Sequence, residues 1–334
     1  MNEKPLHIAI TGVAGFIGSH LAQSLLQDGH SVVGLDNFDP LYPRPLKEHN
    51  LSLIRDCGGE FCFIEGDVRS PEALDRMAAD RAPDAVIHLA ACADMLQAAN
   101  DPVSYTDVNV SGTLQLLEFC VRHKVPGVVF ASSCLVYGER TEVPFKETDP
   151  ACTPRSLYAA TKLAGEQLLH AYSKLHGLNT TCLRFFTVYG PRQRPTMAIH
   201  RFVELATEGK CIELHGHGKV ARDFSYISDI VSGVRLALER MGGYQLYNLG
   251  YSEAFSLLEL VETIRKVSGL TVNYRLRPEH PGDVNITYAG IDLARQRLGW
   301  SPKVGLQEGL TLFVRWYQES GRKIALASRP HMNS

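Results

Sequence analysis

The sequence has no long hydrophobic run and no strong excess of charge of either sign. No segment approaches the roughly 18 apolar residues that a transmembrane helix requires, and the first residues contain no apolar stretch of signal-peptide length. The 34 Lys and Arg residues nearly balance the 36 Asp and Glu residues, and the two signs are mixed along the chain. Nucleic-acid-binding proteins usually carry a basic patch or a high pI. We therefore expect neither a membrane span nor a nucleic-acid partner.

Closely spaced cysteine pairs are also missing, because none of the eight cysteines forms a CxxC motif with another. Several cysteines lie within apolar runs, such as Cys62 in FCFI and Cys182 in TTCLRFF. This pattern is typical of small buried side chains in a reducing compartment, and it argues against a disulfide framework or a zinc site. We therefore expect a cytoplasmic protein that holds no metal.

What the first half does contain is an alternation of short apolar runs, rich in Val and Ile, with longer helical patterns. Such runs suit parallel strands that are buried on both faces, and their alternation with helices indicates βαβ units in a doubly wound sheet. The expected strands are residues 6–11, 31–36, 60–65, 85–90, 127–132 and 180–186, and the expected helices include residues 16–28, 103–123 and 156–176.

The pattern of elements and the composition of the sequence change after about residue 187. The elements become shorter, and Pro and Gly are more frequent, as in GPRQRP, HGHGK and RPEHPGD. This change predicts a second part of the protein, with the ligand cleft between the two parts. The expected fold class is therefore α/β, with a Rossmann-type doubly wound parallel sheet and a second, smaller α/β substrate domain.

The first expected strand leads into the segment TGVAGFIGS, residues 11–19, which opens a helix. Gly12 allows a tight turn, Gly15 lets the backbone approach a pyrophosphate, and Gly18 lets the helix pack closely on the strand. The N-terminus of the helix then presents N–H groups and a partial positive charge to the phosphates. Asp36 ends the second strand, where a carboxylate can accept hydrogen bonds from a ribose diol and would repel a 2′-phosphate. These features predict NAD rather than NADP.

Tyr158 and Lys162 stand four residues apart near the start of a long helical pattern, so they project from the same face. We expect the Lys162 ammonium to lower the pKa of Tyr158, which lets the phenol take a proton from an alcohol. Ser132 and Ser133 come at the end of an expected strand that faces the ligand crevice, where a hydroxyl could hold the substrate oxygen. A surface Tyr–Lys pair is the alternative for this spacing when it is taken alone.

Taken together, these motifs resemble the extended short-chain dehydrogenase/reductase family, in its nucleotide-sugar epimerase and dehydratase branch. The resemblance implies NAD as cofactor, a UDP-sugar or related substrate, and a homodimer formed through the helices near 103–123 and 156–176. The matching motifs are GVAGFIG (12–18), LDN (35–37), GDV (66–68), HLAA (88–91), SSCLVYG (132–138), YAATK (158–162), RFFTVYGPRQRP (184–195), RDFSYISDIV (222–231), YNLG (247–250), PGDV (281–284) and LGWSP (298–302).

The resemblance assigns roles to individual residues and parts of the chain. Residues 1–186 with about 225–252 would form the NAD-binding domain, and residues 187–224 and 253–334 the nucleotide-sugar-binding domain. The implied catalytic residues are Ser133, Tyr158 and Lys162. The implied cofactor contacts are Gly12, Gly15, Phe16, Ile17, Gly18, Asp36, Asn37, Asp67, Val68, Leu89, Ala90, Ala91, Asn109, Tyr158, Lys162 and Val188. The implied substrate contacts are Ser132, Ser133, Thr187, Arg192, Arg194, Arg222, His280 and Asp283.

The branch of the family can be narrowed from the residues that precede VYG. Dehydratases and decarboxylases of the family carry acidic residues there, whereas this chain has Cys134-Leu135. That difference favours 4-epimerisation through a transient 4-keto sugar. The segment 187–197 resembles the stretch of UDP-glucuronate 4-epimerases that meets the sugar carboxylate, with Arg194 as the contact and Thr187 beside it. An arginine fork matches a carboxylate with two parallel hydrogen bonds.

Several alternatives stay open. Arg192 and Arg194 could lie on a solvated loop or contact the nucleotide phosphates. Arg222 could form an ion pair with Asp223. Asp67 could be a strand-end residue without a role in binding. The segment Cys92–Leu96 departs from the usual family pattern, because Leu96 replaces an arginine and Asp94 adds an acid; His280 also replaces a usual Arg or Gln. Other possible functions are 4-epimerisation of neutral UDP-glucose or UDP-N-acetylglucosamine, net oxidoreduction of a nucleotide sugar, or a catalytically silent NAD-binding module.

Overall fold

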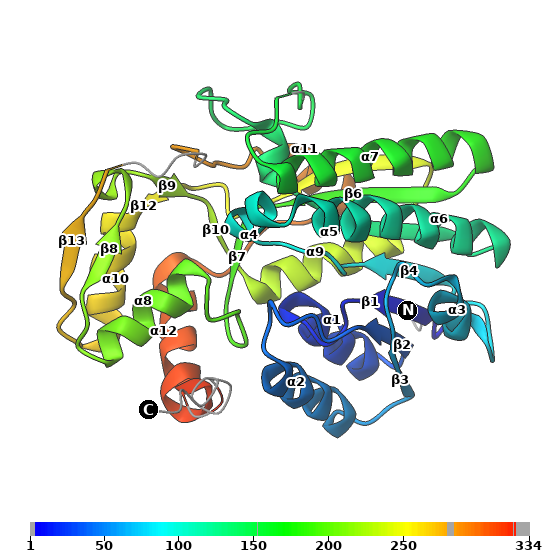
Figure 1. Cartoon of the computed structure of the whole chain (residues 1–334), viewed down its shortest axis with the longest axis horizontal. Helices are drawn as coiled ribbons and strands as arrows, with labels where there is room; N and C mark the ends of the chain where they lie inside the picture. The colour runs from blue at the N-terminus through cyan, green and yellow to red at the C-terminus, as the bar shows by residue number, and fades with distance from the viewer. Residues whose placement is uncertain (1–3, 152, 279–283, 323, 325–334) are drawn as a thin grey trace.

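A seven-stranded parallel sheet forms the centre of the protein (Figure 1). The computed structural model describes residues 4–151, 153–278, 284–322 and 324. The strand order is β11-β6-β5-β4-β1-β2-β3. The chain adds β2 and β3 on one side of β1, and it then adds the later strands, from β4 onward, on the other side. The strands are β1 (His7–Thr11), β2 (Ser31–Asp36), β3 (Phe61–Glu65), β4 (Ala85–His88), β5 (Gly127–Ser133), β6 (Asn179–Phe185) and β11 (Tyr244–Leu249).

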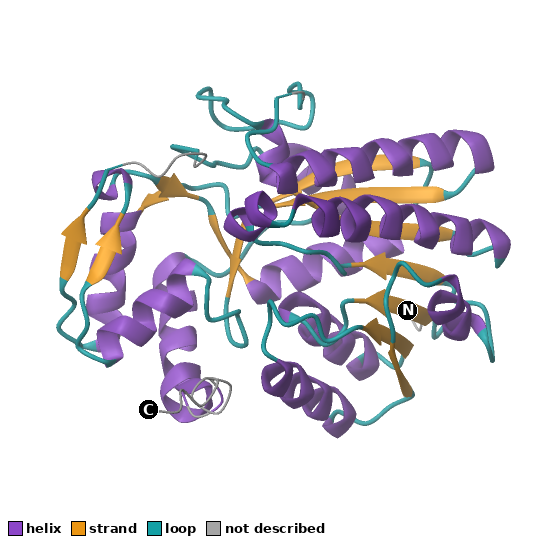
Figure 2. Ribbon diagram, viewed as in Figure 1, coloured by secondary structure: helices purple, strands orange, loops and turns teal. Residues whose placement is uncertain are grey.

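Helices cover both faces of this sheet, as the alternation of strands and helices predicted (Figure 2). Strand β1 shows why, because its successive side chains point to opposite faces. Ile8 and Ile10 pack into one core cluster, which includes Leu21 of a helix on that face, and Ala9 packs into the other. The helices of the first cluster include α1 (Phe16–Gln27), α2 (Arg44–Asp56) and α9 (Ile227–Glu239), and those of the second include α3 (Pro71–Asp75), α6 (Gly112–Arg122) and α7 (Leu157–His176).

Three expectations about these elements need correction. The helix expected over 103–123 is α5 (Pro102–Thr106), a π-helical turn (Asp107–Ser111) and α6 in succession, preceded by α4 (Met95–Asn100). Strand β11 was not among the expected strands. Cys62 is exposed rather than buried, because β3 is an edge strand with one buried residue. Cys182 lies on β6, which pairs with a strand on each side, and is buried as expected.

A smaller group of elements lies beside the carboxyl ends of the strands, at the left of Figure 1. Its three two-stranded sheets are β7 (Thr187–Tyr189) with β10 (Phe224–Tyr226), β9 (Ala221–Arg222) with β12 (Phe255–Ser256), and β8 (Ile212–Leu214) with β13 (Tyr274–Leu276). Its helices are α8 (Ala198–Thr207), α10 (Leu257–Ser268) and α12 (Leu306–Trp316), while α11 (Asp292–Leu298) contacts β11. Within the described ranges, no helix is long and apolar enough to cross a membrane.

Candidate active site

The turn between β1 and α1 has the close approaches that the glycine spacing predicted. Gly12 has a φ of +73°, and a Cβ at this position would lie 2.8 Å from the backbone nitrogen of Ala90. A Cβ on Gly18 would lie 2.3 Å from the carbonyl oxygen of Gly12, so the helix can approach the turn only with glycine there. Gly15 is the N-cap of α1 and provides no side-chain cap, which leaves the N–H groups of the first turn for an anion.

This turn opens into a cavity of about 590 Å³ at the carboxyl ends of the central strands. The cavity brings together nineteen residues that the sequence assigned to cofactor, substrate or catalysis. These are Gly12, Gly15, Phe16, Ile17, Gly18, Asp36, Asn37, Val68, Leu89, Ala90, Ala91, Ser132, Ser133, Tyr158, Lys162, Thr187, Val188, Arg194 and Arg222. Three other described residues of that set, Asp67, Asn109 and Arg192, lie outside the lining, and His280 and Asp283 fall outside the described residues.

Asp36 lines the cavity, but its carboxylate is already engaged by the protein. Its Oδ1 accepts hydrogen bonds from the Lys47 ammonium at 2.8 Å and from the backbone N–H of Phe38 at 2.9 Å. Asp36 and Lys47 are 5% and 6% exposed, so this is a buried ion pair. The sequence reasoning missed Lys47, although its spacing from Asn50, Leu51 and Ile54 puts it on the buried face of α2.

Asp67 and Asn109 hold neighbouring parts of the protein in position. Asp67 accepts hydrogen bonds from Arg69 and from the amide of Asn37, and the bonds from Arg69 lower the pKa of Asp67 to about 2. Asn109 is buried, exchanges hydrogen bonds with the backbone of Cys92, and donates to the hydroxyl of Thr161. For Asp67, this geometry fits the alternative of a strand-end residue. The hydrogen bonds of Asn109 connect the backbone at Cys92 to Thr161 of α7.

The catalytic candidates come from β5 and the first turns of α7. Ser156 caps α7 through its hydroxyl, which accepts from Ala159 N–H at 3.1 Å, so the helix begins just before Tyr158. Burial raises the pKa of Tyr158 to about 12, although its hydrogen bond with Ser133 lowers that pKa. Lys162 has a pKa lowered to about 8 by burial. Its ammonium lies 5.9 Å from the centre of the Tyr158 ring.

The pKa of Tyr158 is raised rather than lowered as a whole, because the cost of burial exceeds the favourable effect of neighbouring groups. Burial dominates for both side chains, because each is more costly to charge away from water. Arg194 is a cation whose charge lowers the pKa of Tyr158, by less than burial raises it. The hydroxyl of Tyr158 thus carries its proton at neutral pH unless a further positive charge lies near it.

Ser132 serves a different purpose from its neighbour. Its hydroxyl donates a 2.5 Å hydrogen bond to Glu166, which also forms a 2.7 Å ion pair with Arg184 on β6. Both ionic side chains are almost fully buried, so Ser132 belongs to a network that joins β5, β6 and α7. Glu166 was missed by the sequence reasoning, although it lies four residues after Lys162 on the same face of α7.

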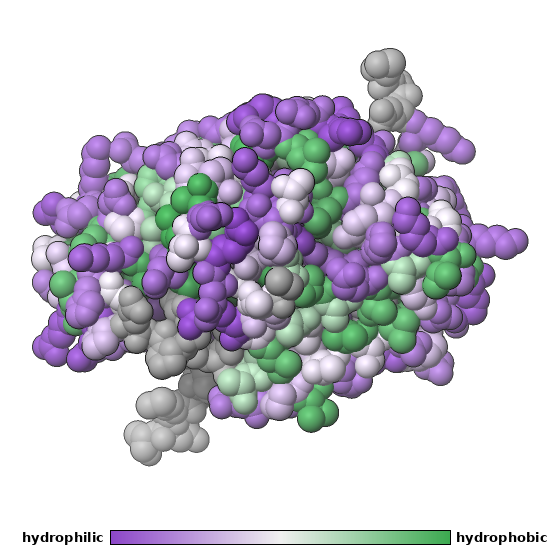
Figure 3. All heavy atoms as spheres, turned by 90° about the horizontal axis from the view of Figure 1, so that it is seen from above, coloured by the Kyte–Doolittle hydropathy of each residue, from purple (hydrophilic) through white to green (hydrophobic). Residues whose placement is uncertain are grey.

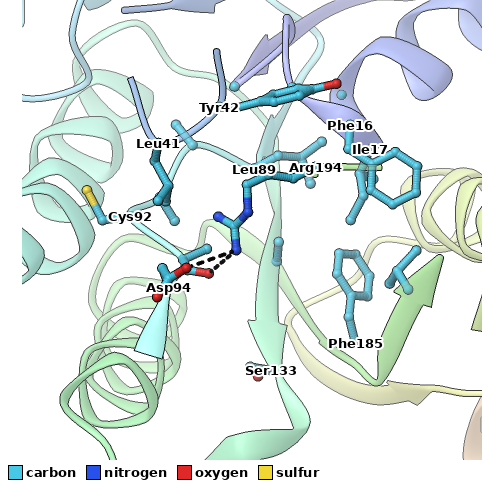
Figure 4. Close-up of a pocket in the computed structure, with 18 of the residues that line it drawn as sticks. Phe16, Ile17, Leu41, Tyr42, Leu89, Cys92, Asp94, Ser133, Phe185 and Arg194 are labelled. Carbon is cyan, nitrogen blue, oxygen red and sulfur yellow. Dashed lines mark hydrogen bonds and ion pairs between the residues drawn. The ribbon is translucent and has the colours of Figure 1, made fainter. Parts of the chain in front are cut away.

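The three arginines assigned to the substrate have different surroundings. Arg192 is 7% exposed with a φ of +68°, its Nε donates to His20 at 3.1 Å, and its carbonyl accepts from Tyr42 at 2.7 Å, so it is no solvated loop residue. Arg194 does line the cavity, beside Asp94 (Figure 4). Arg222 also lines it, while Asp223 accepts hydrogen bonds from the backbone N–H groups of residues 251, 252 and 289.

The residues next to Ser133 carry no acid, in agreement with the sequence. Cys134 and Leu135 line the cavity, and burial raises the pKa of the Cys134 thiol to about 12, so the thiol stays neutral. Among the described residues, the carboxylates that line the cavity are Asp36, Asp39 and Asp94. No group of His, Cys, Asp and Glu in the described ranges is arranged to hold a metal ion.

Comparison with known proteins adds to this geometry. Residues 8–250 match the NAD dependent epimerase/dehydratase family. The chain is 40% identical over 340 residues to UDP-glucuronate 4-epimerase 4 of Arabidopsis thaliana, and the match covers 96% of this chain and 77% of that one. Two solved structures have a TM-score of 0.87 with this fold, each over 94% of this chain and 99% of the other. One is UDP-glucuronic acid 4-epimerase from Bacillus cereus in complex with UDP-glucuronic acid and NAD (36% identity), and the other is UDP-glucose 4-epimerase from Thermotoga maritima with UDP-glucose (31% identity).

Proposed function

Since the chain belongs to the NAD-dependent epimerase/dehydratase family, we propose that it is a UDP-sugar 4-epimerase that converts UDP-glucuronate to UDP-galacturonate with NAD as cofactor. The observation that carries the proposal is the meeting, in one cavity, of the glycine turn, the pair Ser133 and Tyr158, and Arg194. The glycine turn suits a dinucleotide, Ser133 and Tyr158 suit a sugar hydroxyl, and Arg194 suits a carboxylate.

The residues around the turn fit NAD. Gly12 and Gly18 let the turn lie close to Ala90 and to the start of α1, and the uncapped first turn of α1 at Gly15 can then receive a pyrophosphate. Asp36 lies at the end of β2, and its Oδ2, which accepts a hydrogen bond from the backbone N–H of Ala14 at 3.2 Å, has a further lone pair for a ribose hydroxyl. When bound, NAD supplies a reversible acceptor for the hydrogen at the sugar C4, so the epimerisation needs no net oxidant.

The chain's own residues then move the proton at the sugar O4. Tyr158 is the acid–base group, because its hydroxyl is hydrogen-bonded to Ser133 at the end of β5 and lies within the cavity. Ser133 holds the same sugar oxygen and keeps Tyr158 oriented. The positive charge of Arg194 lowers the pKa of Tyr158, but burial still holds that pKa at about 12, so loss of the phenol proton would require a further positive charge, which oxidised NAD would supply when bound. Lys162 also lines the cavity, with its ammonium 5.9 Å from the centre of the Tyr158 ring, and would donate hydrogen bonds to the cofactor ribose.

Two features favour an acidic sugar and an epimerase outcome. Arg194 and Thr187 face the cavity from the segment that follows β6, where a guanidinium can bind a carboxylate through two hydrogen bonds. Cys134 and Leu135 supply no acid for elimination, which leaves Tyr158 as the acid–base group next to Ser133. Arg222 provides a second arginine in the cavity, suited to the diphosphate.

A neutral UDP-sugar is the second candidate substrate, and two observations favour it. The Thermotoga maritima structure that resembles this fold is a UDP-glucose 4-epimerase. In addition, Arg194 lies beside Asp94, which partly neutralises its charge. A net dehydrogenase would instead consume NAD in proportion to the sugar oxidised, and a silent NAD-binding module would convert no sugar at all.

Incubation of the purified protein with UDP-glucuronate, UDP-glucose and UDP-N-acetylglucosamine, each with NAD, tests the proposal. The expected result by chromatography and NMR is UDP-galacturonate from UDP-glucuronate without accumulation of NADH. Tyr158→Phe should abolish conversion and keep NAD binding, because it removes one hydroxyl. Conversion of the neutral sugars alone would overturn the acidic substrate, and full activity of Tyr158→Phe would overturn the mechanism.

We also propose the division of labour that the sequence suggested. Residues 1–186 with about 225–252 would bind NAD, and residues 187–224 and 253–334 would bind the nucleotide sugar. The supporting observation is that the cavity is lined from both ranges, by Gly12 and Asp36 from the first and by Arg194, Arg222 and Thr287 from the second. The seven described cysteines carry free thiols, which supports the cytoplasm as the location.

A homodimer through the helices near 103–123 and 156–176 is a further proposal for this enzyme. Val103 and Leu175 are 77% and 76% exposed, and Leu114 is also exposed, so this helical surface leaves apolar side chains in water. The view from above shows separate groups of hydrophobic residues among hydrophilic ones (Figure 3). Val103→Glu with Leu175→Glu should yield a monomer by analytical ultracentrifugation, whereas Leu276→Glu, an exposed apolar position on β13, should not. A wild-type monomer would overturn the proposal.

A further inference from the structure

Arg194 and Asp94 reach the cavity from two distant segments and meet there. Arg194 comes from the loop between β7 and α8, and Asp94 comes from the segment between β4 and α4. Their closest atoms, Nη2 of Arg194 and Oδ2 of Asp94, are 3.6 Å apart. Both side chains line the cavity and are only 14% and 18% exposed (Figure 4). The pair therefore lies in partly desolvated surroundings, where charges interact more strongly than on an open surface.

The carboxylate of Asp94 is held in this position by its own helix. Its Oδ1 accepts a hydrogen bond from the backbone N–H of Gln97 at 3.2 Å, and its carbonyl accepts from Ala98 N–H at 3.0 Å, as an N-cap residue does. The backbone N–H of Asp94 donates to the Tyr105 hydroxyl at 3.0 Å. Because Oδ1 serves the helix, Oδ2 is the oxygen that faces Arg194.

The guanidinium of Arg194 makes contacts that a ligand carboxylate could replace. Its Nη2 lies 3.6 Å from Oδ2 of Asp94 and donates to the carbonyl of Ala93 at 3.2 Å and to Sδ of Met197 at 3.6 Å. Its Nε is buried and makes no hydrogen bond with any described residue. A separation of 3.6 Å is longer than the roughly 2.7–2.9 Å of a charge-assisted hydrogen bond. A ligand carboxylate that offers two oxygens in the plane of the guanidinium would therefore bind Arg194 better than Asp94 does.

We propose that Asp94 is a specificity-determining residue of this cavity, which competes with the carboxylate of an acidic sugar for Arg194 and so reduces the preference for acidic over neutral UDP-sugars. The inference rests on the proposed function, because it concerns the substrate of the same site. An acidic sugar must draw Arg194 away from Asp94 before its carboxylate can bind. A neutral sugar does not meet this cost, because it can leave the Arg194–Asp94 pair in place.

Asp94→Asn removes the negative charge of this side chain and keeps its helix-capping hydrogen bond. Asparagine caps a helix as well as aspartate does, so the bond to Gln97 is kept while the negative charge is removed. Asp39→Asn is the matched control. Asp39 also lines the cavity and also binds a backbone N–H, that of Leu41 at 2.9 Å, but it is not paired with Arg194. The control therefore removes the same charge from the same cavity.

The experiment measures KM and kcat of the full-length protein with NAD for UDP-glucuronate and for UDP-glucose, and the Kd of each sugar nucleotide by calorimetry. For Asp94→Asn we expect KM and Kd for UDP-glucuronate to fall about fivefold, as for a partly buried ion pair, with those for UDP-glucose unchanged. Asp39→Asn should leave the ratio between the two sugars as in the wild type. The effect of Asp94→Asn should vanish in an Arg194→Gln background, because Asp94 acts through Arg194.

Each result separates the two levels of the proposal. An Asp94→Asn variant that changes both sugars alike, or that weakens UDP-glucuronate, would overturn the role of Asp94 while the wild-type activity stands. An effect that persists in Arg194→Gln would overturn the route through Arg194. If the wild type neither converts nor binds either sugar nucleotide, the proposed function fails, and the role of Asp94 fails with it.

Discussion

The ammonium of Lys47 lies 2.8 Å from the carboxylate of Asp36, and both side chains are buried at the edge of the cavity. The sequence indicated a bare carboxylate that repels a 2′-phosphate. A carboxylate whose charge is balanced by an ammonium repels a phosphate less, so Asp36 and Lys47 act as one unit in cofactor selection.

Asp36→Ser should shift the cofactor preference from NAD toward NADP. The substitution removes the carboxylate and leaves the Lys47 ammonium at the cavity, where it can pair with a 2′-phosphate. We expect the Kd for NADP to fall roughly tenfold and the Kd for NAD to rise, as measured by calorimetry. The double variant Asp36→Ser, Lys47→Met serves as control and should lose the gain for NADP. Unchanged affinities for both cofactors would contradict the assignment of Asp36 to the ribose.

Gly18→Ala should weaken NAD binding while the fold persists. The added Cβ would lie 2.3 Å from the Gly12 carbonyl oxygen, so the turn must move away from α1. We expect at least a roughly tenfold increase in the Kd for NAD. Gly242→Ala is a matched control, since its added Cβ would have no neighbour nearer than 3.8 Å. Equal NAD affinity in Gly18→Ala and Gly242→Ala would show that this approach is not needed for the cofactor.

Lys162→Met should make the protein more stable at neutral pH, although it removes a catalytic group. Burial lowers the pKa of Lys162 from 10.5 to about 8, so the folded state binds its proton less tightly than the unfolded state. The penalty of the charged form is therefore complete below pH 8 and fades as the pH rises toward 10.5. We expect a gain of up to about 3 kcal/mol at pH 7 that disappears near pH 10.5.

Urea denaturation of the wild type and Lys162→Met across this pH range measures the effect. Lys174→Met, which removes a lysine at the end of α7 that is not buried, controls for the loss of one positive charge. A constant difference in stability from pH 7 to pH 10.5 would be incompatible with a buried, titrating Lys162.

Glu166→Ala should destabilise the protein by about 3–5 kcal/mol. The substitution leaves Arg184 buried without its 2.7 Å partner and removes the acceptor of the Ser132 hydroxyl. Replacing both ionic side chains, by Glu166→Leu with Arg184→Met, should recover much of that loss, because no buried charge is left unpaired. Denaturation curves of the single and double variants give the comparison. A double variant less stable than Glu166→Ala would refute this account of the network.

The sequence by itself determined the order of the strands up to β6, the glycine turn and the positions of Ser133, Tyr158 and Lys162. These features depend on local patterns: runs of Val and Ile for buried strands, a glycine wherever a Cβ would clash, and a spacing of four for two side chains on one helix face. That is why β2 begins and ends at the expected residues, and why α1 and α7 each differ from expectation by a single residue at one end.

Only the tertiary structure decided what surrounds those residues. The partners of Asp36 and Arg194 lie on other segments, at Lys47 and Asp94, and no local pattern pairs them. The pKa of Tyr158 follows from how deeply α7 packs against the cavity rather than from its distance to Lys162 along the helix. Cys62 is exposed because β3 has a neighbour on one side only. Burial and charge pairing sum contributions from segments far apart in the chain, so they become definite only when the chain is folded.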